Sequence, residues 1–475
     1  MHRTKRILCA LLSIVMITVL TACANGSKKQ ADSNAAIYFI DDVGKEISLD
    51  APAERIISLY SAHTENLYSL GAEERLIGNY HTAIYPPEAA KLAVYDYSAD
   101  PEKVISADPD LVIIRPLIAR KAPDFVKALE NAGICVVALY PDSLDKFDDY
   151  INKLAKLTGT EDKADELLDE FHSGLAEITA LTKDANPKLS VFFETTETNI
   201  RTTTPESMPG MAITMAGGIN AASDAVASEE GGTIAEYGIE RVLEKADDID
   251  VYVSQRGAMN SGGSLESIAE RDGYDVIKAV KDNRVYTINE KLISSTTFRY
   301  VKGVREMARF LYPDIMDNYD EYRNDNEATR TDFANLIVKH EHMPIYIPSS
   351  SKYYDTPAKG HTFGLFEDVK WYDDDFDYVE TAVYSGAVLW TKDGDKEYFY
   401  PDSPVTREEL AKAIFVLGDF SSNEKNIPVS DLSECENSRI VQILVDSGVF
   451  DLNNGSFEPQ RTVTNNEIIA ALDML

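Results

Sequence analysis

The side chains best suited to chemistry in this sequence are cations and aromatic rings that directly follow apolar runs. A guanidinium group binds carboxylate or phosphate oxygens through paired hydrogen bonds. Tyrosine adds a flat apolar surface and a hydroxyl donor. This mixture favours the binding of an anionic ligand. The candidate ligand-binding residues are Tyr60, His63, Tyr80, His81, Arg115, Arg201, Arg256, Arg299 and Tyr300.

Catalytic motifs are absent from the sequence. It contains no GxSxG, Walker A or HExxH motif, and no GxGxxG motif after a predicted strand. Transition-metal sites are usually rich in imidazole, and residues 187–315 contain no histidine. Glu194 and Glu236 could still supply oxygen ligands, so a bound metal ion remains an alternative. We predict a binding protein that is not an enzyme and has no cofactor.

Strands and helices alternate in the segments that must position these residues. Runs of Val, Ile and Leu between helical segments are typical of parallel sheets covered on both faces. Ligands of such sheets bind beyond the carboxyl ends of the strands, where most of the candidate residues fall. The expected strands are residues 54–60, 75–79, 110–114 and 134–140 in a first lobe and 189–194, 250–255 and 284–289 in a second.

One long segment, residues 143–186, separates the two runs. From Ala164 its apolar residues recur at helical spacing on one face, and Thr160 is placed to cap this helix. We predict an α/β fold with two Rossmann-like lobes, residues 36–142 and 187–315, joined by a long interlobe helix.

The N-terminus combines a basic head with an apolar run in residues 1–22, which is typical of a secretion signal. Leu20-Thr21-Ala22-Cys23 resembles the lipobox of bacterial lipoproteins, which implies lipidation at Cys23. Residues 23–35 are small and polar, as expected of a flexible tether. We predict an extracytoplasmic protein held on the outer face of a membrane by acyl chains.

The charge of the chain excludes some partners. The formal net charge is −34 and the sequence pI is about 4.5. Nucleic acids and anionic lipid surfaces are polyanions and would be repelled. The four cysteines contain no CxxC pair and suggest no disulfide framework.

The C-terminal third changes in composition. Residues 316–328 are polar and charged and are expected to form a linker. Residues 329–475 contain a coarse repeat, in which Thr329, Thr406 and Thr464 each precede an apolar helical segment. An acid three residues after each threonine completes a capping box, which predicts three helices.

Two α/β lobes joined by a long helix resemble the substrate-binding proteins of ABC importers, in particular those serving ferric siderophores, haem and cobalamin. The stretches that carry the resemblance are residues 55–72, 100–114, 238–253 and 277–288. In that family one glutamate on each lobe docks into arginine-lined pockets of the permease. By motif position these are Glu102 and Glu240 here.

The C-terminal repeats resemble S-layer homology repeats, which form a mostly α-helical domain. The arginine of their TRAE-like motif holds an anionic secondary cell-wall polymer. Arg330 and Arg407 match this arginine, whereas Asn465 replaces it in the third repeat. The first repeat also lacks a clear opening segment before Thr329.

The resemblances together imply a lipid-anchored solute-binding protein of a Gram-positive bacterium. It would capture an iron complex, either a ferric siderophore or haem, deliver it to an ABC importer and bind the cell wall through its C-terminal region. One alternative is a structural or adhesive wall protein whose α/β part does not transport. The other is a protein that binds cobalamin or a metal ion.

Substitution of Cys23→Ala is expected to release the protein into the medium, because thioether lipidation requires the thiol. Immunoblots of membrane and medium fractions measure the release. Cys9→Ala, within the apolar run, serves as the control and should remain on the membrane. Retention of the Cys23→Ala protein on the membrane would contradict the lipobox interpretation.

Overall fold

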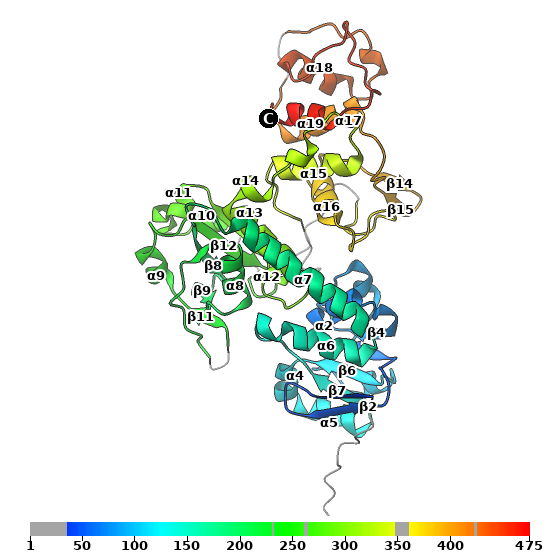
Figure 1. Cartoon of the computed structure of the whole chain (residues 1–475), viewed down its shortest axis with the longest axis vertical. Helices are drawn as coiled ribbons and strands as arrows, with labels where there is room; N and C mark the ends of the chain where they lie inside the picture. The colour runs from blue at the N-terminus through cyan, green and yellow to red at the C-terminus, as the bar shows by residue number, and fades with distance from the viewer. Residues whose placement is uncertain (1–35, 230–231, 261–264, 347–360, 422–424) are drawn as a thin grey trace, which may run out of the picture.

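The computed structural model describes residues 36–229, 232–260, 265–346, 361–421 and 425–475. These residues form lobe 1 (36–160), lobe 2 (187–316) and a C-terminal module (317–475). Lobe 1 and the C-terminal module lie at opposite ends of the long axis, and lobe 2 lies to one side between them (Figure 1). No helix in the described part of the chain is long and apolar enough to cross a membrane.

Lobe 1 is built on a five-stranded parallel sheet in the order β5-β4-β3-β6-β7. The two central strands, β3 and β6, are completely buried, as expected of a parallel sheet covered by helices on both faces. The strands are β3 (Ile56–Ser58), β4 (Leu76–Asn79), β5 (Ala93–Val94), β6 (Leu111–Ile114) and β7 (Cys135–Ala138), with the hairpin β1 (Ile37–Ile40) and β2 (Glu46–Leu49) beside them. The helices are α2 (Ser61–Ser69), α3 (Glu102–Ile105), α4 (Pro116–Lys121), α5 (Pro123–Asn131) and α6 (Phe147–Thr158).

Lobe 2 repeats this plan with a four-stranded parallel sheet in the order β10-β8-β12-β13. Its strands are β8 (Ser190–Glu194), β10 (Ile219–Asn220), β12 (Val251–Arg256) and β13 (Val285–Asn289), and β9 (Arg201–Thr203) pairs with β11 (Ile234–Glu236) in a separate antiparallel pair. Its helices are α8 (Met208–Met215), α9 (Ile239–Glu244), α10 (Leu265–Ala269), α11 (Lys278–Lys281), α12 (Glu290–Ile293), α13 (Tyr300–Leu311) and α14 (Pro313–Met316). The predicted two-lobed α/β fold is confirmed.

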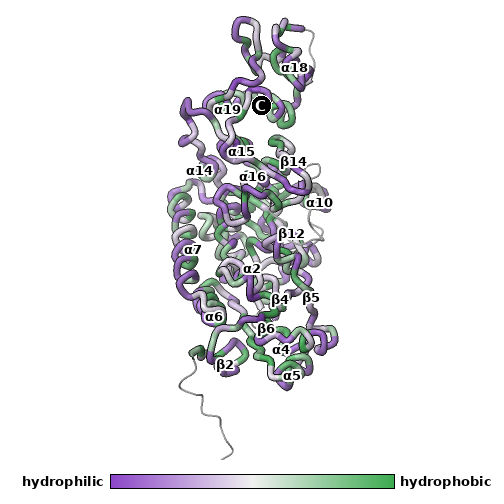
Figure 2. The backbone as a smooth tube through the Cα atoms, turned by 90° about the vertical axis from the view of Figure 1, so that its right-hand side faces the viewer, coloured by the Kyte–Doolittle hydropathy of each residue, from purple (hydrophilic) through white to green (hydrophobic). Residues whose placement is uncertain are grey.

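The interlobe helix is α7 (Glu161–Thr182), which runs from lobe 1 to lobe 2 (Figure 1). Its buried face meets both lobes: the Phe171 ring centroid lies 4.6 Å from that of Phe147 in lobe 1 and 6.4 Å from that of Tyr300 in lobe 2. Polar and apolar residues alternate along the helix in Figure 2, as expected for one covered and one solvent-facing side.

The interlobe helix is shorter than the segment 143–186 assigned to it, and it begins directly after Thr160, the residue predicted to cap it. Gly159, in the left-handed conformation with φ of 68°, ends α6 within lobe 1. Only α7 joins the lobes. Thr160 precedes α7, but its side chain makes no capping hydrogen bond there and instead pairs with the Thr158 hydroxyl.

The C-terminal module contains the three helices predicted from the repeats, and each begins with a capping box. These helices are α15 (Arg330–His340), α17 (Arg407–Leu417) and α19 (Asn465–Leu472), accompanied by α16 (Phe376–Tyr384), α18 (Ser438–Ser447) and the hairpin β14 (Thr391–Asp393) and β15 (Lys396–Tyr398). α16 packs on α15 and α18 packs on α17.

The three repeats meet in a closed ring of backbone hydrogen bonds. The Ala328 amide donates to the Val463 carbonyl (2.9 Å), Val463 donates to Val405 (3.0 Å), and Val405 donates to Ala328 (3.0 Å). All three side chains are buried. Ala328 belongs to the segment expected to be a linker, and Asp317 in that segment is buried against Arg309. Both ends of the segment 316–328 are therefore part of the packing, whereas the residues between them are mostly exposed.

Candidate ligand-binding site

The strand order of lobe 1 reverses between β3 and β6, which is where ligands bind in open α/β sheets. Tyr60 follows β3 and Arg115 follows β6, so this topology brings two of the predicted residues together. The guanidinium carbon of Arg115 lies 4.6 Å from the ring centroid of Tyr60 and 4.6 Å from that of Tyr140. Two aromatic faces thus hold one cation in place.

Arg115 has no ion-pair partner among the described residues, and its Nε is buried without a hydrogen-bond partner. An unpaired buried donor is costly, so an oxygen atom supplied from outside would be stabilised here. Burial raises the pKa of Tyr60, which keeps its hydroxyl protonated and able to donate.

Lys291 brings a second cation to this position from lobe 2. Its Nζ donates to Ser61 Oγ at 3.0 Å, at the first residue of α2. Burial lowers the pKa of Lys291, although the Glu290 and Glu65 carboxylates oppose this shift. Sequence reasoning missed Lys291, although its position just beyond the carboxyl end of β13 could have indicated it.

Arg299, also predicted to bind ligand, is instead used in a contact between the lobes. Its Nε and Nη2 donate to the two carboxylate oxygens of Glu65 in lobe 1 at 2.7 and 2.6 Å. The Tyr85 ring centroid lies 3.5 Å from the guanidinium carbon. Because both partners are buried and paired, the charge of Arg299 is already neutralised. The structure corrects this assignment.

Two further assignments are corrected by burial. His63 is completely buried, with Nδ1 2.8 Å from the Tyr150 hydroxyl and Nε2 3.3 Å from the Ile114 carbonyl. Tyr300 is also completely buried and donates to the Met208 carbonyl at 2.6 Å. Both side chains stabilise the lobes and do not reach the rim, that is, the edge of each sheet beyond the carboxyl ends of its strands.

The remaining predicted residues lie in different environments. Tyr80 and His81 follow β4, with ring centroids 4.1 Å apart, and burial raises the pKa of Tyr80 to about 12. Arg201 pairs with Glu236 at 2.9 Å. Arg256, at the end of β12, is half-buried and has no ion pair within the described ranges.

The metal alternative finds little support in the described residues. Glu194 is buried and ion-paired with Arg271, and it accepts hydrogen bonds from Tyr252 and Ser254. Its oxygens are therefore occupied. Among the described residues, no group of three or more His, Cys, Asp or Glu side chains could hold a metal ion.

Comparisons with known proteins agree with this geometry. Residues 56–292 match the family model described as periplasmic binding protein, and residues 365–411 match the S-layer homology domain. The two lobes are a periplasmic binding protein domain.

Curated relatives match this periplasmic binding protein domain over most of their own length. An uncharacterized ABC transporter substrate-binding lipoprotein of Bacillus subtilis is 28% identical over 316 residues, which are 64% of this chain and 95% of that protein. The vitamin B12-binding protein of Vibrio cholerae is 24% identical over 262 residues, 55% of this chain and 90% of that protein. These relatives are substrate-binding proteins, not enzymes.

A solved structure from Staphylococcus epidermidis, described as a possible iron-binding (periplasmic solute-binding) protein, is 26% identical. It covers 55% of this chain and 99% of its own, with a TM-score of 0.48.

Glu102 and Glu240 occupy equivalent places on the two lobes of the periplasmic binding protein domain. Glu102 begins α3 and Glu240 lies in the first turn of α9. Both side chains are exposed, and neither forms an ion pair with a described residue. Both carboxylates are therefore available to a partner.

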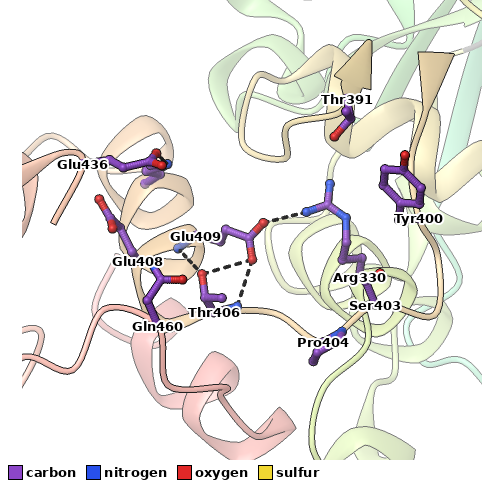
Figure 3. Close-up of a pocket in the computed structure, with 11 residues that line it drawn as sticks. Arg330, Thr391, Tyr400, Ser403, Pro404, Thr406, Glu408, Glu409, Glu436 and Gln460 are labelled. Atoms are coloured by element: carbon purple, nitrogen blue, oxygen red, sulfur yellow. Dashed lines mark hydrogen bonds and ion pairs between the residues drawn. The ribbon is translucent and has the colours of Figure 1, made fainter. Parts of the chain in front are cut away.

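Arg330 of the C-terminal module is largely enclosed by its own domain. It donates to Glu409 at 2.8 Å, to the Phe399 carbonyl at 2.7 Å and to the Leu389 carbonyl. It lines a groove of 340 Å³ between α15 and α17 (Figure 3). The groove also contains Glu408, Glu409 and Glu436, with Lys412 paired to Glu436, so its surface is mixed in charge.

Arg407 is more available than Arg330. Its guanidinium lies over the Phe450 and Phe457 rings, and Nη2 donates to the Asp451 carbonyl at 2.5 Å. Its Nε is buried without a partner among the described residues. In the third repeat, the position of the motif arginine is occupied by Asn465, which is buried and contacts Asn324.

The buried His63 predicts a pH dependence of stability. Burial lowers its pKa from 6.5 to about 3, so between these values the unfolded chain binds a proton that the folded protein does not. The free energy of unfolding should therefore fall as pH decreases from 6.5, by up to about 1.4 kcal/mol per pH unit. The free energy of unfolding can be measured in urea titrations between pH 7 and 4.5. His63→Gln should lower its dependence on pH by the amount that corresponds to one bound proton. The exposed His172 is the control, and an equal reduction in His172→Gln would contradict the assignment.

Proposed function

We propose that the protein captures an anionic iron complex, a ferric siderophore or haem, outside the cytoplasm and delivers it to an ABC importer. The observation that carries this proposal is Arg115, which lies unpaired between Tyr60 and Tyr140 at the reversal point of the lobe 1 sheet. The substrate-binding relatives support the transport role.

The charge around this position favours an anionic ligand. Arg115 from lobe 1 and Lys291 from lobe 2 converge near the first turn of α2, where the helix dipole adds partial positive charge. An anionic ligand could accept hydrogen bonds from both lobes at once. A ligand without an oxygen acceptor at this position would leave the Arg115 Nε buried and unpaired, which costs about 1–3 kcal/mol.

Cobalamin is the second candidate ligand. The relatives that bind vitamin B12 favour it, and the aromatic group of Tyr80, His81 and Tyr97 offers a flat surface at the rim. The unpaired cations argue for the iron complex in preference.

Delivery would use the two exposed carboxylates of the lobes. Glu102 and Glu240 both lie in first helical turns, so arginine pockets on a two-fold permease could receive one glutamate each. Such charge-assisted pairs orient a large partner.

Attachment to the cell surface would use two further features. Cys23 lies outside the described residues and is proposed to carry the lipid anchor. The C-terminal module is proposed to bind secondary cell-wall polymer through Arg330 and Arg407. Arg407 is the stronger candidate, because it keeps an unpaired Nε and lies within the matched S-layer homology segment, 365–411.

Calorimetric titration of the full chain tests the ligand. Haemin and a ferric carboxylate siderophore should bind more tightly than cobalamin or zinc ion. Arg115→Gln should weaken their binding about 10- to 100-fold, the loss expected of a charged hydrogen bond. Arg120→Gln changes an exposed arginine on α4, the helix that directly follows Arg115; this variant is the control and should bind like the parent. No heat with any of the four compounds would contradict the transport assignment and favour a structural wall protein.

Sedimentation with purified cell wall tests the module. The full chain should bind intact wall but not wall stripped of its anionic polymer. Arg407→Gln should lower the bound fraction at least 10-fold, whereas the exposed Arg439→Gln should not. Equal binding of Arg407→Gln and the parent would remove Arg407 from the site.

A further inference from the structure

The C-terminal module lies directly against lobe 1. The Trp371 ring meets the Tyr85 ring edge to face, with centroids 6.0 Å apart. A Cβ atom at Gly364 would come within 2.5 Å of Pro87 Cγ, so the module's backbone touches this segment of lobe 1 without an intervening side chain. Residues 85–87 belong to the connection that follows β4.

The same module also contacts lobe 2, through one face of α13. Lys302 Nζ lies 2.5 Å from Asp377 Oδ2, and the Ile345 amide donates to Glu306 Oε1 at 3.0 Å. Arg309 donates to the Met343 carbonyl at 2.8 Å. These contacts come from residues 343–345 and from α16, two separate parts of the module.

The contact on lobe 1 continues into the junction between the lobes. Tyr85, which Trp371 contacts, covers the guanidinium of Arg299, and Arg299 is paired with Glu65 across the junction. Burial raises the pKa of Tyr85, and the Asp377 carboxylate adds to this, which is consistent with its position close to the ring. A continuous series of contacts thus runs from the module to the interlobe ion pair.

We propose that the C-terminal module packs across the junction of the two lobes and holds them in one relative position. It is attached to lobe 1 at Tyr85 and Pro87 and to lobe 2 at α13. A module on a flexible linker would leave the lobes free, whereas this docking restrains their relative movement and sets the orientation of the binding site relative to the wall. This inference does not depend on the identity of the ligand, and its statement about the wall rests on the proposed wall binding of the module.

The chain supplies its own reporter for this contact. It contains two tryptophans, Trp371 and Trp390, and both lie in the module. With Trp390 replaced by Phe, the remaining fluorescence reports on Trp371, which is half-buried at the contact with lobe 1.

Two glycines provide a matched pair of substitutions in this Trp390→Phe background. Gly364 has φ of +72° and Gly448 has φ of +82°, so an alanine at either position is strained. Only Gly364→Ala also collides with lobe 1, because nothing lies within 4 Å of a Cβ at Gly448. The difference between the two variants therefore isolates the docking contact.

Gly364→Ala should shift the Trp371 emission to longer wavelength and at least double its quenching by acrylamide. Amide hydrogen exchange in residues 61–69 and 294–300, on either side of the junction, should accelerate about 10-fold or more. Gly448→Ala should leave both measurements unchanged. Lys302→Gln, which removes one attachment to lobe 2 without strain, should accelerate exchange in the same two segments.

Circular dichroism identifies the variants that keep the helix content of the parent. If Gly364→Ala loses helix content, Lys302→Gln is compared with the parent in its place. Equal quenching and exchange in Gly364→Ala and Gly448→Ala, or unchanged exchange in Lys302→Gln, would overturn the proposal. Quenching of Trp371 in the parent as fast as in the urea-unfolded chain would also overturn it, since the module would then be undocked.

Discussion

The buried ion pair between Glu65 and Arg299 is the contact on which the arrangement of the lobes depends. Moving two charges out of water is costly unless each finds its partner with good geometry. Here the guanidinium meets the carboxylate through two hydrogen bonds and is covered by Tyr85. Only the observed position of the lobes brings the two groups into this geometry, so the pair favours that relative position. That position places Lys291 of lobe 2 beside the first turn of α2 in lobe 1.

An apolar connection accompanies the ionic one. The buried residues of α7 belong to a single hydrophobic core that includes parts of both lobes. Phe171 lies at its centre, in contact with Phe147 and Phe298. A helix packed in this way is a stiffer link than a loop, which favours modest lobe movement.

The charge of the protein is distributed to suit this arrangement. The chain is strongly acidic as a whole, yet the reversal point of lobe 1 presents an unpaired cation. Aromatic faces can hold a guanidinium without neutralising it, and Tyr60 and Tyr140 do so for Arg115.

Local sequence patterns were sufficient to predict the central strands of both sheets and the three capped helices of the C-terminal module. Capping boxes at Thr329, Thr406 and Thr464 act within a few residues, and apolar runs determine which segments are buried as strands. The stretches of family resemblance follow the same order along the chain. A left-handed glycine at position 159, also a local feature, ends α6 just before Thr160, where the interlobe helix was predicted to start.

Tertiary structure alone decided which charges are free. Arg115 and Arg299 have the same chemistry and both lie near the expected rim, but Arg299 meets a carboxylate 234 residues away in the sequence. No pattern of local spacing encodes such a pairing, because it depends on how two separately folded lobes meet. The burial of His63, the approach of Lys291 and the docking of the module on Tyr85 have the same origin. Backbone hydrogen bonding and apolar periodicity act locally, whereas desolvation and charge pairing depend on every segment that packs around a side chain.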